Sequence, residues 1–263
     1  MFVFPEFDPV IFSIGPLKVR WYGLMYVVGF LVAWWLARRR ARVGHAIIKT
    51  SQHVDDLIFY AMLGVILGGR LGSILFYHFD KFAGDPLYLL RIWEGGMSFH
   101  GGLIGVLVAM WLFGRKHGKT MWQITDFMAP FVPLGLGFGR IGNFINGELW
   151  GKPAGVPWGF LYRGEVLHPT QLYEAVLEGF VLFAILWWFS SKARPYMAVS
   201  GLFLVLYGAF RFVIEFYRVP DAHIGYLAFD WLTMGQVLSA PMILIGAVML
   251  GMAYGKKSKE AAA

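Results

Sequence analysis

Residues 234–254 read MGQVLSAPMILIGAVMLGMAY and carry no charged side chain. A helix needs about 20 mostly apolar residues to cross the hydrocarbon core of a bilayer, and this run has that length. The whole chain has the same character, because 58% of its 263 residues are hydrophobic, 15% are charged and the mean hydropathy is +0.59. The sequence therefore predicts an integral membrane protein.

Six further apolar runs of comparable length are bounded by charged residues, Gly or Pro. With the last run they predict an all-α fold, a polytopic membrane helical bundle of about seven transmembrane helices that forms a single integral membrane domain over residues 1–263. The fourth run is expected to be kinked or only partly helical, because Pro130 and Pro133 interrupt its hydrogen-bond ladder. The predicted spans are 21–37, 56–79, 97–113, 123–144, 171–189, 199–217 and 234–254.

The lysines and arginines between the runs predict the orientation, because cytoplasmic loops of membrane proteins carry an excess of these residues. Thirteen of the 23 cations follow the first, third, fifth and seventh runs, seven lie in the alternate segments, and three lie inside the runs. The N-terminus is therefore predicted outside and the C-terminus in the cytoplasm. The thirteen are Arg38, Arg39, Arg40, Arg42, Lys49, Arg115, Lys116, Lys119, Lys192, Arg194, Lys256, Lys257 and Lys259.

The remaining composition excludes several kinds of site. The formal net charge of +7 does not predict a nucleic-acid partner, because the cations are spread over short loops. The chain has no cysteine, so any reacting thiol must belong to a substrate. No histidine and carboxylate spacing of the metalloenzyme type is present, and neither a metal nor another cofactor is expected. Residues 1–16 lack an early positive cluster and do not predict a cleaved signal peptide.

Arg70, Arg140 and Arg211 lie inside the predicted spans, where a charged side chain costs about 3 kcal/mol on insertion scales and usually faces an interior cavity. With the predicted orientation all three fall in the outer parts of outward-running spans. Their guanidinium groups suit a phosphate there, and a phospholipid headgroup is the first anion expected, while charge alone also fits a transported carboxylate. For Arg70, a structural role and substrate binding are equally compatible with the sequence.

Two polar segments adjoin the predicted spans. Residues 139–148, GRIGNFINGE, place Arg140, Asn143 and Glu148 around a predicted helix end. Polar side chains at membrane depth must satisfy one another, so this segment predicts a closed hydrogen-bond network, a binding site, or both. Residues 168–174, HPTQLYE, form a predicted helix start whose polar first turn by itself indicates capping.

Two further groups carry chemistry. His100 lies within residues 96–102, GMSFHGG, where glycines allow a ligand or a neighbouring backbone to come close. A lone histidine at a membrane interface is more often a structural hydrogen-bonder than a catalyst, and the flanking glycines shift that balance toward a functional residue. Tyr207, Arg211 and Glu215 are spaced i, i+4 and i+8, so they line one helix face, and Glu215 is predicted to pair with Arg211.

Several of these motifs, in this order, resemble the sequence motifs of bacterial prolipoprotein diacylglyceryl transferases. The similarity runs from the N-terminus through residues 234–236 and so covers nearly the whole chain. The segments that carry it are FPEFDPVIF (4–12), GGMSFHGG (95–102), GRIGNFINGELWG (139–151), HPTQLYE (168–174) and YGAFRF (207–212).

The resemblance implies that the protein transfers the diacylglyceryl group of phosphatidylglycerol to the lipobox cysteine thiol of a preprolipoprotein and releases glycerol phosphate. The substrate would then supply the thiol that the chain lacks. The implied location is the bacterial cytoplasmic (inner) membrane, with the active site toward the outer leaflet. The family's essential positions correspond here to Tyr22, His100, Arg140, Asn143, Glu148, Tyr207, Arg211 and Glu215.

For this reaction, preorganised donors must stabilise the charge that grows on the leaving phosphate. Arg140 and Arg211 are assigned to that phosphate, with Asn143 and Tyr207 as further donors and Glu215 orienting Arg211. These assignments make all five residues phosphatidylglycerol-binding candidates.

The attacking thiol must also lose its proton, because a thiol with a reference pKa of about 8.5 is mostly un-ionised near neutrality. His100 is the candidate general base. Glu148 either orients Arg140 or is itself the base, a choice that the sequence leaves open. Tyr22 is expected to bond the headgroup glycerol or to close the cavity.

Two other functions fit part of the pattern. Ionisable residues inside spans also mark the paths of transporters and proton pumps, but such a path needs polar groups through the whole depth of the membrane, and here the inner halves of the spans are apolar. An intramembrane serine protease needs an exposed serine with a histidine partner, and the Gly-x-Ser-x-Gly motif is absent. Without the resemblance, the residues predict a membrane enzyme or carrier that handles an anionic lipid.

Overall fold

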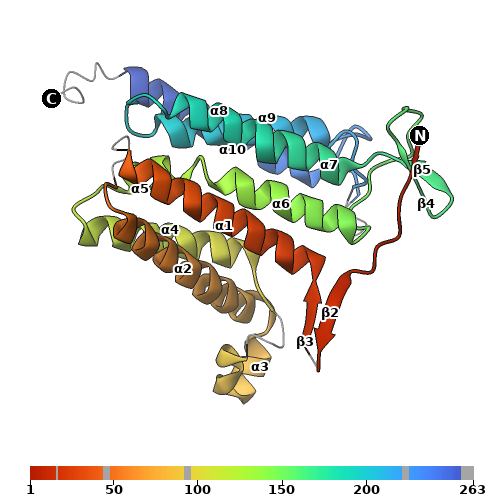
Figure 1. The fold of residues 1–263 in the computed structure, drawn as a ribbon, viewed down its shortest axis with the longest axis horizontal. Helices are drawn as coiled ribbons and strands as arrows, with labels where there is room; N and C mark the ends of the chain where they lie inside the picture. The colour runs from red at the N-terminus through yellow and green to blue at the C-terminus, as the bar shows by residue number, and fades with distance from the viewer. Residues whose placement is uncertain (16, 44–47, 92–95, 221–224, 256–263) are drawn as a thin grey trace. The chain divides into compact units, whose positions relative to one another are not determined.

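The computed structural model describes residues 1–15, 17–43, 48–91, 96–220 and 225–255, which are mostly helical (Figure 1). The chain divides into two compact units. Unit 1 comprises Met1–Leu36 and Met128–Ala263, and unit 2 comprises Ala37–Phe127. The positions of the units relative to one another are not determined, so each is described by itself. The predicted cytoplasmic cations Lys256, Lys257 and Lys259 lie outside the described residues.

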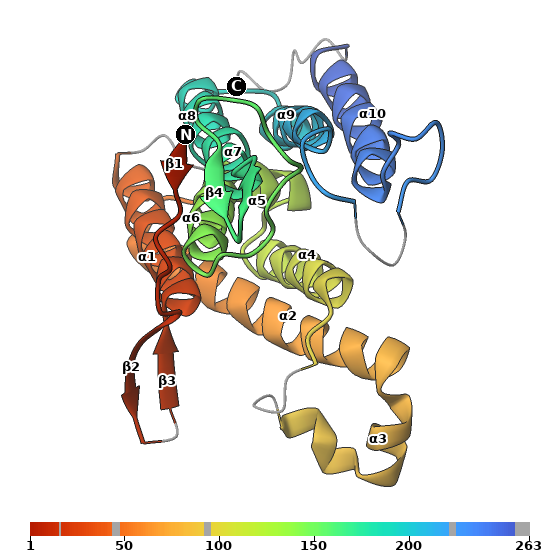
Figure 2. The same ribbon diagram turned by 90° about the vertical axis from the view of Figure 1, so that its right-hand side faces the viewer.

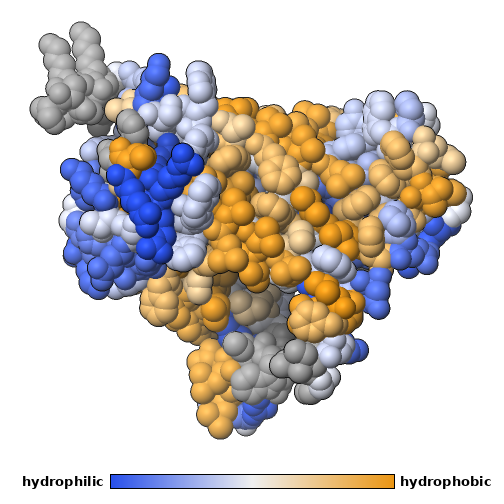
Figure 3. All heavy atoms as spheres, in the orientation of Figure 1, coloured by the Kyte–Doolittle hydropathy of each residue, from blue (hydrophilic) through white to orange (hydrophobic). Residues whose placement is uncertain are grey.

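Four helices in the described part of the chain are long and apolar enough to cross a membrane, and a fifth, α9 (Ala198–Ile214), is apolar but shorter. Large apolar side chains such as Phe59, Leu75 and Leu244 are exposed, and Figure 3 shows apolar side chains along the helices with hydrophilic ones gathered near helix ends. Lipid suits such a surface better than water does. The membrane helical character is therefore confirmed, whereas the count of seven spans remains a prediction. The four helices are α1 (Trp21–Arg42), α2 (Ser51–Tyr77), Thr170–Phe189 and α10 (Met234–Gly255).

The fourth predicted run is broken into two helices, α5 (Met121–Met128) and α6 (Val132–Ile145). Pro130 lies in the turn between them. Pro133 lies in the first turn of α6, where its missing N–H leaves no helical hydrogen bond unmade. The interruption predicted from these prolines is therefore present.

Helix Thr170–Phe189 consists of α7 (Thr170–Glu174), the π-helical segment η3 (Ala175–Val181) and α8 (Leu182–Phe189). In unit 1, η3 packs against α6 and α9 packs against α10 (Figure 2). Glycines line both contacts: a Cβ atom on Gly137 would lie 3.1 Å from Cα of Gly179, and one on Gly201 would lie 3.0 Å from the carbonyl oxygen of Gly246. Small residues at such contacts let the backbones approach closely, as in other membrane helix pairs.

Short strands in unit 1 are the part of the fold that the apolar pattern did not predict. β2 (Val10–Ile14) and β3 (Leu17–Arg20) form an antiparallel hairpin. β1 (Phe2–Val3) pairs in parallel with β4 (Phe160–Tyr162), which pairs antiparallel with β5 (Glu165–Leu167). The all-α prediction is therefore wrong for these segments, which are too short for an alternating pattern to stand out.

The N-terminal arm is anchored by Phe4, which is 7% exposed. Its ring makes edge contacts with Phe144 on α6 and with Trp150 and Tyr162 beyond it. Aromatic pairs in this geometry add to the stabilisation from burial. The arm therefore packs against the segment that follows α6.

In unit 2, α2 packs against α4 (Phe99–Lys116) through glycines on both helices. Gly64 and Gly68 on α2 face Gly101 and Gly105 on α4, and a Cβ atom on Gly105 would overlap the carbonyl oxygen of Gly64. The two backbones are therefore in direct contact. Two short helices follow α2, namely α3 (Phe79–Gly84) and the 3-10 helix η1 (Pro86–Leu90).

Candidate functional site

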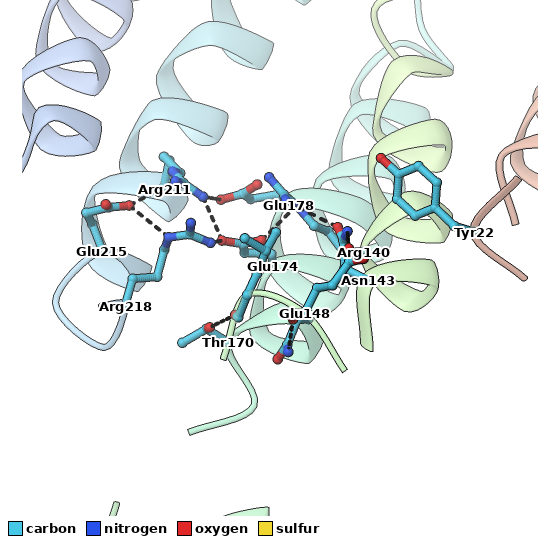
Figure 4. A network of polar contacts seen from close by, with 12 residues as sticks. Tyr22, Arg140, Asn143, Glu148, Thr170, Glu174, Glu178, Arg211, Glu215 and Arg218 are labelled. Atoms are coloured by element: carbon cyan, nitrogen blue, oxygen red, sulfur yellow. Dashed lines mark hydrogen bonds and ion pairs between the residues drawn. The ribbon is translucent and has the colours of Figure 1, made fainter. Parts of the chain in front are cut away.

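Glu174, the last residue of α7, is the centre of a cluster of ion pairs in unit 1 (Figure 4). Its side chain is fully buried, and its carboxylate contacts three guanidinium groups. Oε2 lies 2.7 Å from Nε of Arg140 on α6, and Oε1 accepts a hydrogen bond of 2.6 Å from Nη1 of Arg211 on α9. Nη1 of Arg218, in the segment after α9, donates to the same Oε1. One carboxylate thus joins arginines from three parts of the chain.

Glu215 completes a ring of alternating charges with Glu174. Its Oε2 lies 3.0 Å from Nη2 of Arg211 and 3.5 Å from Nε of Arg218. The ion pair between Arg211 and Glu215 that the i, i+4 spacing predicts is therefore present. Gly235 on α10 leaves room for this carboxylate, because a Cβ atom there would lie 2.6 Å from Cδ of Glu215.

Glu178 lies one turn after Glu174, in η3, and its side chain is 1% exposed. Its Oε1 lies 3.9 Å from Nη1 of Arg211. Within the part of the chain that the structure describes, neither of its carboxylate oxygens has a hydrogen-bond partner. Glu178 is thus as deep as Glu174 but holds no arginine closely.

Glu148, in the turn after α6, binds two asparagine side chains. Nδ2 of Asn143 donates to Oε2 at 3.1 Å, and Nδ2 of Asn146 donates to Oε1 at 3.3 Å. Arg140 reaches this group only through Nη1, which donates to Oδ1 of Asn143 at 3.5 Å. Glu148 therefore has no direct contact with Arg140, so of its two predicted roles the direct orientation of Arg140 is not supported. Glu174 holds Arg140 instead.

The segment 168–174 holds the turn that carries Glu148. Oγ1 of Thr170 donates to the carbonyl oxygen of Leu149 at 2.9 Å, and Nε2 of Gln171 donates to the carbonyl oxygen of Glu148. Leu149 has a φ of 58°, a left-handed conformation that costs a non-glycine residue energy and is held here by these bonds. The capping interpretation is wrong, because the N-cap residue is Pro169, which makes no side-chain cap bond.

His168 opens this segment and is a hydrogen-bonding residue. Its Nδ1 lies 2.9 Å from the hydroxyl of Tyr173, which also accepts a hydrogen bond of 2.8 Å from Nε1 of Trp158. Burial lowers the pKa of His168, because desolvation disfavours the charged ring. Burial therefore disfavours a positive charge on this imidazole.

Tyr22 and Tyr207 are the remaining predicted site residues of unit 1. The Tyr22 hydroxyl donates to the Tyr26 hydroxyl at 3.3 Å, and Figure 4 shows its ring set apart from the arginines and glutamates. The Tyr207 ring stacks on Phe203 with 5.8 Å between centroids and packs against the buried apolar cluster that includes Leu182. Among the described residues, neither hydroxyl hydrogen-bonds to the ion-pair cluster.

Arg70 lies on α2 in unit 2 and is 2% exposed. Its guanidinium donates to the backbone carbonyl oxygens of Tyr88, Leu89, Arg91 and Gly96, and lies 4.3 Å from the centroid of the Tyr88 ring. These bonds use Nε and both Nη groups. The structure therefore favours the structural role over the predicted part in phospholipid binding, because the donors already hold the chain between α2 and α4.

His100 also lies in unit 2, in the first turn of α4, where Oγ of Ser98 caps the helix by accepting a hydrogen bond of 3.2 Å from the N–H of Gly101. The imidazole is exposed and packs edge-on against Phe99. It makes no hydrogen bond to any described residue. His100 is thus not a structural hydrogen-bonder here, and its part as a base stays a prediction.

The cluster in unit 1 is suited to binding an anion through Arg140. Nε of Arg140 lies against Glu174, and among the described residues the one hydrogen bond that its guanidinium makes is the 3.5 Å bond from Nη1 to Asn143. Arg211 differs, since both of its Nη atoms already contact carboxylates. The described residues contain no group of three or more His, Asp or Glu that could hold a metal ion.

Glu174, Glu178 and Arg218 were not identified from the sequence. Arg218 looks like an ordinary cation at the end of a span, and Glu174 looks like a polar residue of a helix start. The available signal was the i, i+4 spacing of the two glutamates, which places two carboxylates on one face of an otherwise apolar helix. Buried carboxylates at that depth require cations nearby.

Comparison with known proteins gives one consistent result. The family model "Prolipoprotein diacylglyceryl transferase" matches residues 9–252. A protein of Methylococcus capsulatus is 59% identical over 98% of this chain and 100% of its own length, and one of Oleidesulfovibrio alaskensis is 57% identical over 100% and 98%. A third, of Azotobacter vinelandii, is 54% identical over 99% and 100%. All three carry the name "Phosphatidylglycerol--prolipoprotein diacylglyceryl transferase".

Proposed function

The chain belongs to the prolipoprotein diacylglyceryl transferase family, and from this premise we propose that it transfers the diacylglyceryl group of phosphatidylglycerol to the lipobox cysteine of preprolipoproteins. The observation that carries the proposal is the extent of the match. Relatives named for this reaction are 54–59% identical over nearly the full length of both chains. The family model spans residues 9–252, so every residue of the ion-pair cluster lies inside it.

The reaction replaces a carbon–oxygen bond with a carbon–sulfur bond. The cysteine sulfur attacks the glyceryl carbon next to the phosphate, the bond from that carbon to oxygen breaks, and the electron pair leaves with glycerol phosphate. A base takes the thiol proton, which is finally released to the leaving phosphate or to water. The protein must therefore favour the thiolate and stabilise an oxyanion.

We assign the oxyanion first to Arg140. Its Nε lies 2.7 Å from the Glu174 carboxylate, which leaves the Nη side of the guanidinium for a phosphate. Arg211 adds positive charge behind it, with Glu215 orienting Arg211. Asn143 links Arg140 to Glu148, and Tyr207 and Tyr22 stay candidates for contacts with the lipid. His100 and Glu148 remain the two candidates for the base.

We also propose that the protein is a single integral membrane domain of seven spans in the bacterial cytoplasmic (inner) membrane. The N-terminus would lie outside, the C-terminus in the cytoplasm, and the site toward the outer leaflet. Cations at the C-terminal ends of α1 and α4 support this orientation, because lysines and arginines are more frequent on the cytoplasmic side. They are Arg39, Arg40 and Arg42 on α1, and Arg115 and Lys116 on α4.

The test is a purified assay with phosphatidylglycerol and a lipobox peptide, run with the cysteine peptide and with a serine peptide of otherwise identical sequence. We expect glycerol phosphate to be released only with the cysteine peptide, together with a peptide heavier by one diacylglyceryl group. Absence of thiol-dependent release would refute the transferase function. Equal release with both peptides would indicate a hydrolase.

A further inference from the structure

One buried carboxylate holds the arginines of this site together. Glu174 contacts Arg140, Arg211 and Arg218, which come from α6, from α9 and from the segment after α9. Three guanidinium groups so close repel one another, and burial weakens the screening of that repulsion. An anion among them is therefore required for the arrangement, even with no substrate bound.

The direction of the contacts matters as much as the charge. Nε of Arg140 lies 2.7 Å from Oε2 of Glu174, an ion pair without a directed hydrogen bond, and this contact sets which side of the planar group lies against the carboxylate. A lipid phosphate that meets the other edge then finds donors already oriented. Preorganised donors of this kind stabilise a developing oxyanion without reorganisation during the reaction.

The helix that carries Glu174 is itself held in place. Thr170 and Gln171, one turn earlier, bind the backbone carbonyl oxygens of Leu149 and Glu148. After Glu174 the helix widens into the π-helical segment η3, a form that is rare and common at functional sites. The bonds of Thr170 and Gln171 therefore hold the start of α7 in place, and with it the position of Glu174.

We propose that Glu174 is a positioning residue for diacylglyceryl transfer: it acts through Arg140, whose orientation toward the lipid phosphate it sets, and it neutralises Arg211 and Arg218 meanwhile. This inference rests on the transferase function proposed above. It predicts that loss of the Glu174 charge harms the chemical step more than lipid binding, because all three arginines remain to attract the anionic headgroup.

The experiment compares Glu174→Gln with Glu174→Asp, and uses Glu178→Gln as the matched comparison within the same cluster. Glu178 is equally buried and lies on the same helix, but its closest arginine contact is 3.9 Å. For Glu174→Gln we expect kcat to fall on the order of 100-fold while KM for phosphatidylglycerol stays equal or falls. Glu174→Asp, which keeps the charge on a shorter side chain, should lose on the order of tenfold. Glu178→Gln, which removes a carboxylate 3.9 Å from Arg211 and leaves the contact with Arg140 intact, should lower kcat by a smaller factor, on the order of tenfold.

The outcomes separate the inference from the function on which it rests. A wild-type protein without thiol-dependent transfer would defeat the transferase function. With an active wild type, normal kcat in Glu174→Gln, or equal losses in Glu174→Gln and Glu178→Gln, would overturn the positioning role. If Glu174→Gln does not fold, as judged by thermal unfolding in detergent, Glu174→Asp decides: lower kcat at unchanged KM supports the role, and wild-type kcat overturns it.

Discussion

Nε of Arg140 lies 2.7 Å from Oε2 of Glu174, and this pair joins two segments that are far apart in the sequence. Glu174 is fully buried, whereas the Arg140 side chain is 24% exposed. The carboxylate of this pair is thus shielded from solvent, whereas the guanidinium is partly accessible. A buried carboxylate with several cation contacts is costly to disturb, since loss of one partner leaves an uncompensated charge.

Arg140→Lys should therefore behave as a severe change although it keeps the charge. A lysine offers one compact ammonium and cannot hold Glu174 with one edge while presenting another to a phosphate. We expect kcat/KM for phosphatidylglycerol to fall on the order of 100-fold in the purified transfer assay. Arg194→Lys is the control, because Arg194 donates to the backbone of Phe189, away from the cluster. Similar activity of both variants would contradict the assignment of the phosphate to Arg140.

Asn143 and Asn146 offer a second comparison, because both donate to Glu148. Asn143 is buried and also accepts from Arg140, whereas the bond from Asn146 is exposed. Glu148 is exposed, so water can replace the bond from Asn146, whereas loss of the buried Asn143 also removes the link to Arg140. We expect Asn143→Leu to lower kcat on the order of tenfold or more and Asn146→Leu to have a much smaller effect. Equal losses would show that Asn143 does not act through its link to Arg140.

The helices could be predicted from the sequence, because a helix that crosses a bilayer needs a long apolar run. Such a run can be recognised from consecutive residues alone. Residues 234–254 predicted a helix, and α10 covers Met234–Gly255. The prolines of the fourth run likewise predicted the break before α6. β1 and β4 were not accessible from the sequence, because they pair between distant segments and are only two and three residues long.

About half of the site residues could also be predicted from consecutive residues alone. Arg140 and Arg211 stand out because a charge inside an apolar run is rare and costly. Glu174 and Arg218 lie at helix ends, where polar residues are common and need no explanation. Their importance comes from contacts with each other across the fold, and one sequence does not report which distant residues meet.

Gly235 gives a third prediction, since its lack of a side chain makes room for Glu215. A Cβ atom there would lie 2.6 Å from Cδ of Glu215, so Gly235→Ala must push this carboxylate away from Arg211 and Arg218. We expect transfer to fall on the order of tenfold with little change in thermal unfolding, because a flexible side chain can move. Gly251→Ala on the same helix meets nothing within 4 Å and should be fully active. Wild-type activity of Gly235→Ala would mean that the position of Glu215 is unimportant.

His100 gives the last prediction, which also decides between the two candidate bases. His100→Asn keeps a polar side chain of similar size but cannot take the thiol proton, so lipid binding should persist while transfer falls on the order of 100-fold or more. Because the thiolate fraction grows toward pH 8.5, the rate of a variant without its base should rise with pH more steeply than that of the wild type. His53→Asn is the control, since His53 is in contact with His117 in unit 2 and not with α4's first turn. If Glu148 is the base, Glu148→Gln will show the steep pH dependence and His100→Asn will transfer at the normal rate, which would end the assignment of His100.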